Sequence, residues 1–372
     1  MIGTCSDTAT TNLGNKKGAV TILEDKWGHP LLKFECQRHV RELHVKHYGI
    51  SISGRSTTGV GDKLFTEVRD NWDKKIVNNI DYQDLCLFDW NQCDFLVQKA
   101  SESLALMDKL LDSDNDMFNR GDYKTLAMLV RVYLTGDIHK FRFAKPIRTS
   151  HARFLQKGIY YLTCELLSYQ LGDELMKMNF SDEQFQEFSY MAEFVALFYC
   201  PWFFKSSLSA DSPLNDLDIV EDIRKLRDAC SDDPKVVIAA EQCLKSIYRH
   251  SRYLHPQLVV MALGSDKVTA GEKKAIAEAM MSMKPHFDVK KVIKDYTKLD
   301  VKKVWPEGQS RPSLAKFVTK DSWLMLSLLD LMEDPKDVEW LSQDVKLWRG
   351  PGHDRFVQFV RGVDVVNDSS ER

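Results

Sequence analysis

The sequence predicts a mainly α-helical protein that begins with a small α/β unit. In the first 48 residues, two short apolar runs alternate with two stretches of helical spacing. From Asp62 to about Leu331 nearly every segment repeats apolar residues at i, i+3 and i+4, and alternating β-branched runs are scarce. The order strand, helix, strand, helix is typical of an α/β unit, so we expect a partial α/β core joined to a large helical body.

Each element near the start has a local signal. We expect residues 1–6 to form a short buried strand and residues 31–35 a second one. Residues 17–27 carry apolar side chains at helical spacing, and Gly28 suits the position just past a helix end. A second helix is expected over 36–47.

The helical body follows a connection rich in Gly, Ser and Thr at residues 49–61. No internal repeat of fixed period appears, so a solenoid is not favoured. Apolar periodicity predicts helices over 104–111, 126–132, 150–175, 185–204, 216–229, 234–248, 271–283, 314–331 and 356–366.

Composition limits the classes of protein. The chain has 372 residues, a formal net charge of −3 and no apolar run long enough for a membrane span. A net negative charge argues against non-specific coating of nucleic acid. The eight cysteines lack framework spacing, and the start lacks a secretory signal, so we expect reduced thiols and a cytoplasmic or nuclear protein.

One local segment is strongly basic. Residues 139–157 hold six Lys or Arg side chains and no acid, with phenylalanines interleaved. The segment is either a solvated loop leading into a helix or a surface that contacts phosphates. The candidate nucleic-acid-binding residues are Lys140, Arg142, Lys145, Arg148, Arg153 and Lys157.

Acidic residues stand near both ends of the chain. Asp7 follows the first expected strand, where α/β sheets place functional side chains, although a turn-forming Asp is also common there. Asp368 and Glu371 have the spacing of one helix face, or belong to a solvated end. Carboxylates that converge from separate elements are the arrangement that metal-dependent phosphoryl transfer requires.

Cys36-x-x-His39 follows the second expected strand. A structural zinc site usually takes four ligands with a second close pair, and no such pair is evident in the sequence. The alternative is a buried Cys and a hydrogen-bonded His that brace the first turn of a helix.

Together these motifs resemble the catalytic domain of hAT-type transposases. Asp7 with its polar Thr/Asn sequel, Cys36-x-x-His39 and the final Ser369-Ser370-Glu371-Arg372 are similar in order to that family's second acid, its C-x-x-H motif and its third acid. The similarity extends to a hAT-like group in invertebrate genomes through Phe143-x-x-Pro146, His151-Ala152-Arg153-Phe154 and Asp211-x-Pro213-x-Asn215-Asp216-Leu217.

The resemblance implies a ribonuclease-H-like α/β core, formed by residues 1–49 and 346–372, with a helical insertion domain over 50–345. It also implies that Asp7 and Glu371 are catalytic and bind Mg²⁺ or Mn²⁺, that Cys36 and His39 are structural, and that DNA is the partner in the nucleus. A homo-oligomer is compatible with this interpretation.

The same resemblance places a first catalytic Asp on a strand before Asp7. We therefore expect a truncated or domesticated relative that is inactive alone. The alternative is a non-enzymatic helical module that binds DNA or protein. A serine or thiol hydrolase and a P-loop enzyme are disfavoured, because Gly-x-Ser-x-Gly, the thiol-protease signature and the phosphate loop are absent from the sequence.

Overall fold

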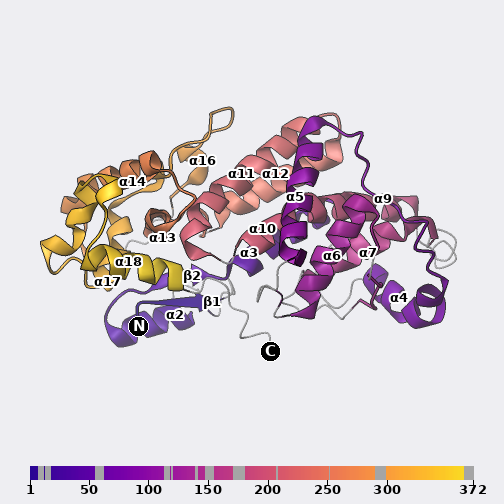
Figure 1. Cartoon of the computed structure of the whole chain (residues 1–372), viewed down its shortest axis with the longest axis horizontal. Coiled ribbons are helices and arrows are strands. Elements are labelled where there is room, and N and C mark those ends of the chain that lie inside the picture. Colours follow the sequence, from indigo (N-terminus) through magenta and orange to yellow (C-terminus); the bar gives the residue numbers. More distant parts are fainter. Residues whose placement is uncertain are drawn as a thin grey trace. The chain divides into compact units, whose positions relative to one another are not determined.

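The computed structural model describes residues 1–6, 12, 18–54, 63–112, 118, 120–138, 141–146, 155–170, 181–206, 208–250, 252–289 and 299–363. This part of the protein is mainly helical, which confirms the prediction, and its strands are β1 (Gly3–Ser6) and β2 (Leu32–Glu35) (Figure 1). The helices are α2 (Ala19–Trp27), α3 (Gln37–Ser53), α4 (Lys63–Asn71), α5 (Asp94–Asp112), α6 (Gly121–Thr135), α7 (Leu155–Leu166), α9 (Asp182–Phe194), α10 (Cys200–Lys205), α11 (Ser212–Ala229), α12 (Pro234–Arg249), α13 (Pro256–Val259), α14 (Ala270–Met283), α16 (Val301–Val304), α17 (Leu324–Leu328) and α18 (Pro351–Gly362). Among the described helices, none combines the length and the apolar character needed to cross a membrane.

The two strands pair in parallel, with Gly3 opposite Leu32 and Ser6 opposite Glu35, and α2 joins them. The strands and helices expected over the first 48 residues are thus present, but β1 is half-buried rather than buried, and α3 continues to Ser53, into the connection expected to begin at residue 49. A Cβ on Gly3 would lie 2.7 Å from the carbonyl oxygen of Leu32, so the close approach of β1 to β2 requires glycine at this position. Gly28 ends α2 in the left-handed region, at φ 70°.

The chain forms two compact units. Unit 1 contains Met1–Val40, Lys205–Glu221 and Ile247–Arg372. Unit 2 contains Arg41–Phe204 and Asp222–Ser246. Both ends of the chain therefore belong to unit 1.

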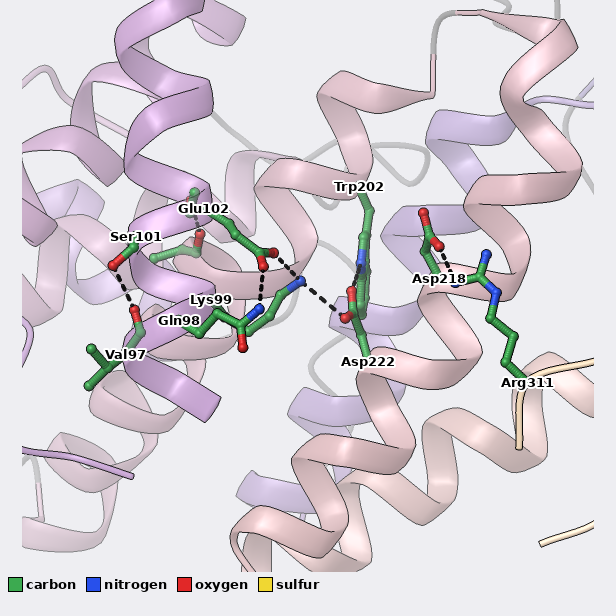
Figure 2. Close-up of polar contacts among 11 residues, drawn as sticks. Val97, Gln98, Lys99, Ser101, Glu102, Trp202, Asp218, Asp222 and Arg311 are labelled. Atoms are coloured by element: carbon green, nitrogen blue, oxygen red, sulfur yellow. Dashed lines mark hydrogen bonds and ion pairs between the residues drawn. The ribbon is translucent and has the colours of Figure 1, made fainter. Parts of the chain in front are cut away.

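Unit 2 is built around α7, which packs between α6 and α9. Every residue of α7 is buried, because neighbouring helices cover it on several sides. Polar contacts tie further helices to this body: Asp222 on α11 accepts hydrogen bonds from Lys99 on α5 and from Trp202 on α10 (Figure 2).

The aromatic segment predicted as one helix over 185–204 is a continuous helical run with a π-type turn at Val195–Tyr199. The wide turn directly precedes Pro201, whose ring would crowd the carbonyl four residues earlier in a regular α-helix. Cys200 N–H donates to the Val195 carbonyl instead.

Two predicted helices are interrupted. In the described part of the range 150–175, α7 is followed by a turn at Leu167 and a further helical turn at residues 168–170, while residues 150–154 and 171–175 lie outside the described residues. The Leu166 carbonyl accepts the N–H of Cys86 at 2.9 Å. The helix expected over 314–331 is wrong as a single element. It divides into short turns, and Thr319 starts a new one by accepting the Asp321 N–H at 3.2 Å.

In unit 1, α18 packs against the turns at residues 260–264 and 335–342. Its Phe359 ring lies 6.4 Å from the Phe34 ring of β2, measured between centroids. The helix α18 thus contacts the sheet through these two rings, and Figure 1 shows α18 beside β2.

Candidate functional site

The carboxyl ends of β1 and β2 meet at one edge of the sheet. Cys36, the residue after β2, donates its backbone N–H to the carbonyl of Ser6, the last residue of β1, at 2.8 Å. The predicted catalytic Asp7 follows Ser6 in the chain and itself lies outside the described residues, as does Glu371. Ligands of parallel α/β sheets bind at the carboxyl ends of the strands, which makes this edge the candidate site.

Cys36 and His39 stand at the junction between β2 and α3. Cys36 is buried and His39 is half-buried in the first turn of α3. In the part of the chain that the structure describes, no three His, Cys, Asp or Glu side chains are grouped so that they could hold a metal ion. The structure therefore places Cys36 and His39 at this edge of the sheet.

A buried polar network continues from this junction. Glu35, the last residue of β2, lies 3.2 Å from His250 Nδ1 through its Oε2 atom, and the Glu35 side chain is only 5% exposed. Gln37, at the start of α3, donates from Nε2 to Ser212 Oγ at 2.6 Å. The end of β2 is thereby tied to the start of α11 and to the segment after α12.

Arg252 completes the network. Its Nη2 donates to the same Ser212 hydroxyl and lies 3.6 Å from Asp216 Oδ1. Asp216 Oδ2 also accepts the backbone N–H of Leu254, which adopts a positive φ of 51°. Such a backbone conformation is uncommon for a residue other than glycine, and the hydrogen bond to buried Asp216 holds it in place.

Chemically, this network is a fixed set of charges and hydrogen-bond donors behind the sheet edge. Ser212 Oγ accepts two hydrogen bonds, so it acts as a positioning group for Gln37 and Arg252. Glu35, His250 and Arg252 were not predicted from the sequence. No local motif marks them, because their partners come from distant parts of the chain.

The predicted basic surface is placed only in part. Lys140, Arg148 and Arg153 lie outside the described residues. Arg142 is exposed, and its guanidinium carbon lies 5.1 Å from the centre of the Tyr82 ring. Lys145 is exposed and forms an ion pair with Asp73.

The prediction that Lys157 belongs to the nucleic-acid-binding surface is wrong. Its residue is only 2% exposed, because α7 is buried along its whole length between α6 and α9. A phosphate outside the protein could not reach its ammonium group in this structure. The interleaved Phe141 and Phe143 are buried as well, so they belong to the core of unit 2.

Comparisons of the chain with protein-family models, with curated proteins and with solved structures found no match. The candidate site is therefore defined by the geometry of its own residues, and above all by the junction of Ser6 with Cys36.

Proposed function

We propose that this chain derives from a hAT-like transposase, an enzyme that cuts and joins DNA by metal-dependent phosphoryl transfer. In this proposal, unit 1 holds a ribonuclease-H-like α/β core, and the helical unit 2 is an insertion between the second and third acids. Such a protein acts on DNA in the nucleus.

The observation that carries the proposal is the hydrogen bond between Cys36 and Ser6. Two motifs that carry the resemblance, the acid after a strand and the Cys-x-x-His pair, stand far apart in the sequence. Parallel pairing of β1 with β2 puts Ser6, the residue before Asp7 in the chain, and Cys36 at the same edge of the sheet. A chance similarity of short motifs would not require that convergence.

The division of the chain gives further support. Unit 1 takes residues from both ends of the chain, and unit 2 lies between them in the sequence as Arg41–Phe204 and Asp222–Ser246. Residues 205–221 and 247–345, which were expected in the insertion over 50–345, belong to unit 1 instead. The contact of Phe359 with Phe34 also brings the C-terminal helix, which precedes Glu371 in the chain, to the strands. A core interrupted by a helical insertion has this chain order.

The donor set of the proposed site is two carboxylates, Asp7 and Glu371. Carboxylate oxygens are hard ligands that suit Mg²⁺ and Mn²⁺. When bound, such an ion polarises a phosphate and activates the attacking oxygen. The two carboxylates would hold the ion, while the network behind Glu35 keeps the sheet edge rigid.

We expect Asp7→Asn and Glu371→Gln each to weaken Mn²⁺ binding by about tenfold or more, because each removes a charged ligand. Isothermal titration of the full chain with Mn²⁺ measures this. Asp25→Asn is the matched control, since Asp25 is an exposed acid on α2 in the same unit.

A parallel assay follows Mn²⁺-dependent nicking of hairpin and duplex DNA. Any nicking by the purified chain must disappear in Asp7→Ala. Mn²⁺ affinity that is unchanged in Asp7→Asn, or nicking that survives Asp7→Ala, would contradict the proposed role of this residue.

A second candidate function is a non-enzymatic module that binds DNA through residues 139–157. The exposed Arg142 and Lys145 favour it, because both stand on one short segment of unit 2. Their aromatic neighbours are buried and fix that segment on the helical body.

For this module we expect Arg142→Glu combined with Arg148→Glu to weaken binding of duplex DNA and to reduce its salt dependence. Each phosphate interaction that is lost makes the slope of log affinity against log salt shallower by close to one unit, so the double variant is expected to lose up to about two units. Fluorescence anisotropy at several salt concentrations measures the slope. Lys336→Glu, an exposed lysine of unit 1, is the control, and an unchanged slope in the double variant would dismiss the surface.

A further inference from the structure

Unit 2 contains a cavity of about 470 Å³ between α6, α7 and the segment 141–146. Pockets of about 300–1,000 Å³ are the usual size of small-molecule sites. The cavity is lined by residues of unit 2 alone, and the proposed nuclease chemistry does not use it.

One end of the cavity is apolar and deeply buried. Its walls include Leu129 of α6 and Ile159 of α7, which are 1% and 6% exposed. Phe141 and Phe143 line it from the third side, and their rings meet edge to face at a centroid distance of 5.1 Å. Aromatic and aliphatic walls of this kind favour a ring or a branched apolar group.

The other end is polar and nearer to solvent. There Arg120 donates to Asp122 through Nε at 3.0 Å and through Nη2 at 2.5 Å. Gln156 of α7 donates to the same carboxylate at 3.2 Å, which sets the starts of α6 and α7 side by side. Further along α6, Thr125 and Leu129 also line the cavity.

Two of the lining side chains, Arg120 and Lys145, are cationic, and one, Asp122, is anionic. Arg120 is paired with Asp122, whereas Lys145 is paired with Asp73, which does not line the cavity. The side chains of Lys145 and Asp73 are 40% and 67% exposed, and an ion pair so exposed contributes little, so an anion in the cavity can replace Asp73 at Lys145. The first turn of α6 adds backbone N–H groups, because its N-cap residue makes no side-chain capping bond.

We propose that this cavity binds a small amphipathic monoanion, an aromatic carboxylate or a compound of the same class. Its apolar rings would lie between Leu129, Ile159 and the two phenylalanines. Its anionic group would lie at the polar end, near Lys145 and the start of α6. This site is independent of the nuclease ancestry proposed above.

Two fluorescent probes with the same ring system test the assignment. Anilinonaphthalene sulfonate carries one negative charge, and phenylnaphthylamine is its neutral counterpart. Titrated into the full chain at low salt, the sulfonate is expected to bind at one site per chain and more tightly than the neutral probe. A neutral probe that binds as tightly or more tightly would overturn the assignment of an anion, and the lack of saturable binding would overturn the site.

Variants locate the site. Lys145→Gln is expected to weaken sulfonate binding by about two- to fivefold, the scale of one exposed ion pair, and to leave the neutral probe unaffected. Lys124→Gln is the matched control, because Lys124 is exposed on α6 and does not line the cavity.

Leu129→Phe is expected to fill the apolar end and to abolish binding of both probes. Because this buried substitution also strains the core, its folding is checked by circular dichroism, and Lys145→Gln provides the independent reading. Sulfonate affinity that is the same in Lys145→Gln and in Lys124→Gln would contradict the proposed site, as would full binding by a folded Leu129→Phe variant.

Discussion

Replacing Asp222 with alanine is expected to lower the free energy of unfolding by about 2–3 kcal/mol, because it removes one of the two carboxylates that pair with buried Lys99 and leaves the indole N–H of Trp202 without an acceptor. Asp222 Oδ1 lies 3.0 Å from Lys99 Nζ, and Asp222 Oδ2 accepts the indole N–H of Trp202 at 2.9 Å (Figure 2). The side chains of Lys99 and Asp222 are only 11% and 15% exposed. The substitution therefore removes the acceptor of the Trp202 indole and leaves Glu102 as the carboxylate that pairs with Lys99.

The protonation state of Lys99 decides the pH at which the Asp222 variants are compared. Burial lowers the pKa of Lys99, but the carboxylates of Asp222 and Glu102 outweigh burial, and the net pKa is raised. A lysine whose pKa is higher in the folded than in the unfolded state stabilises the fold fully at pH values below its unfolded-state pKa. That stabilisation is lost as pH rises through the folded-state pKa. Measurements at pH 7 thus report the charged pair.

Urea unfolding at pH 7 measures the effect, and hydrogen–deuterium exchange of peptides from α5 and α10 locates it. Asp228→Ala is the matched control on the same helix. Asp228 pairs with Arg227 at 2.9 Å, but its side chain is 67% exposed, so we expect a loss below about 0.5 kcal/mol. Asp222→Asn, which keeps an acceptor for Trp202, is expected to fall between the two.

A double variant separates the cost of a stranded charge from the value of the pair. Lys99→Met with Asp222→Leu removes both charges and is expected to lose less stability than Asp222→Ala alone. If the double variant is the less stable of the two, the destabilisation does not come from the buried charge.

Gly352→Ala is expected to cost about 2–3 kcal/mol of stability, the scale of overpacking in a closed core. Gly352 lies in the first turn of α18, where an added Cβ would stand 2.0 Å from the carbonyl oxygen of Asp337. That neighbour is backbone, in the turn Pro335–Ser342 packed on α18, so it cannot rotate away.

Gly362→Ala provides the contrast on the same helix. A Cβ there would meet no atom within 4 Å, so this substitution is expected to stabilise the protein by up to about 1 kcal/mol through helix propensity. Urea unfolding measures both variants, and hydrogen exchange of residues 335–362 locates the change. Equal effects of the two substitutions would show that the close approach at Asp337 does not constrain α18.

Local patterns predicted the elements whose signals are local. Val20, Leu23 and Trp27 mark α2, and Gly28 marks its end, so this helix was predicted with its boundary. The prediction over 314–331 was wrong because its apolar spacing concealed a competing signal. Ser313 and Thr319 each accept a backbone N–H two residues ahead, which starts separate short turns.

The candidate site, too, was predicted from the sequence only in part. Asp7 was selected because it follows one apolar run, and Cys36 because its Cys-x-x-His motif follows another. Nothing in those runs states that β1 and β2 are neighbours, yet the bond from Cys36 to Ser6 depends on it. The pairing of Glu35 with His250 could not be predicted from the sequence, because the two residues stand far apart in the chain and neither belongs to a motif.

The sequence by itself determined the helical class, the β1–α2–β2 start and the motifs that suggest a transposase ancestry, because periodicity and turn residues act within a few positions. Only the tertiary structure decided which charges are available. Lys157 and Lys145 belong to one basic segment, but the packing of α7 buries the first and leaves the second at the surface. Burial depends on what the rest of the chain places against a residue, and that information is not local.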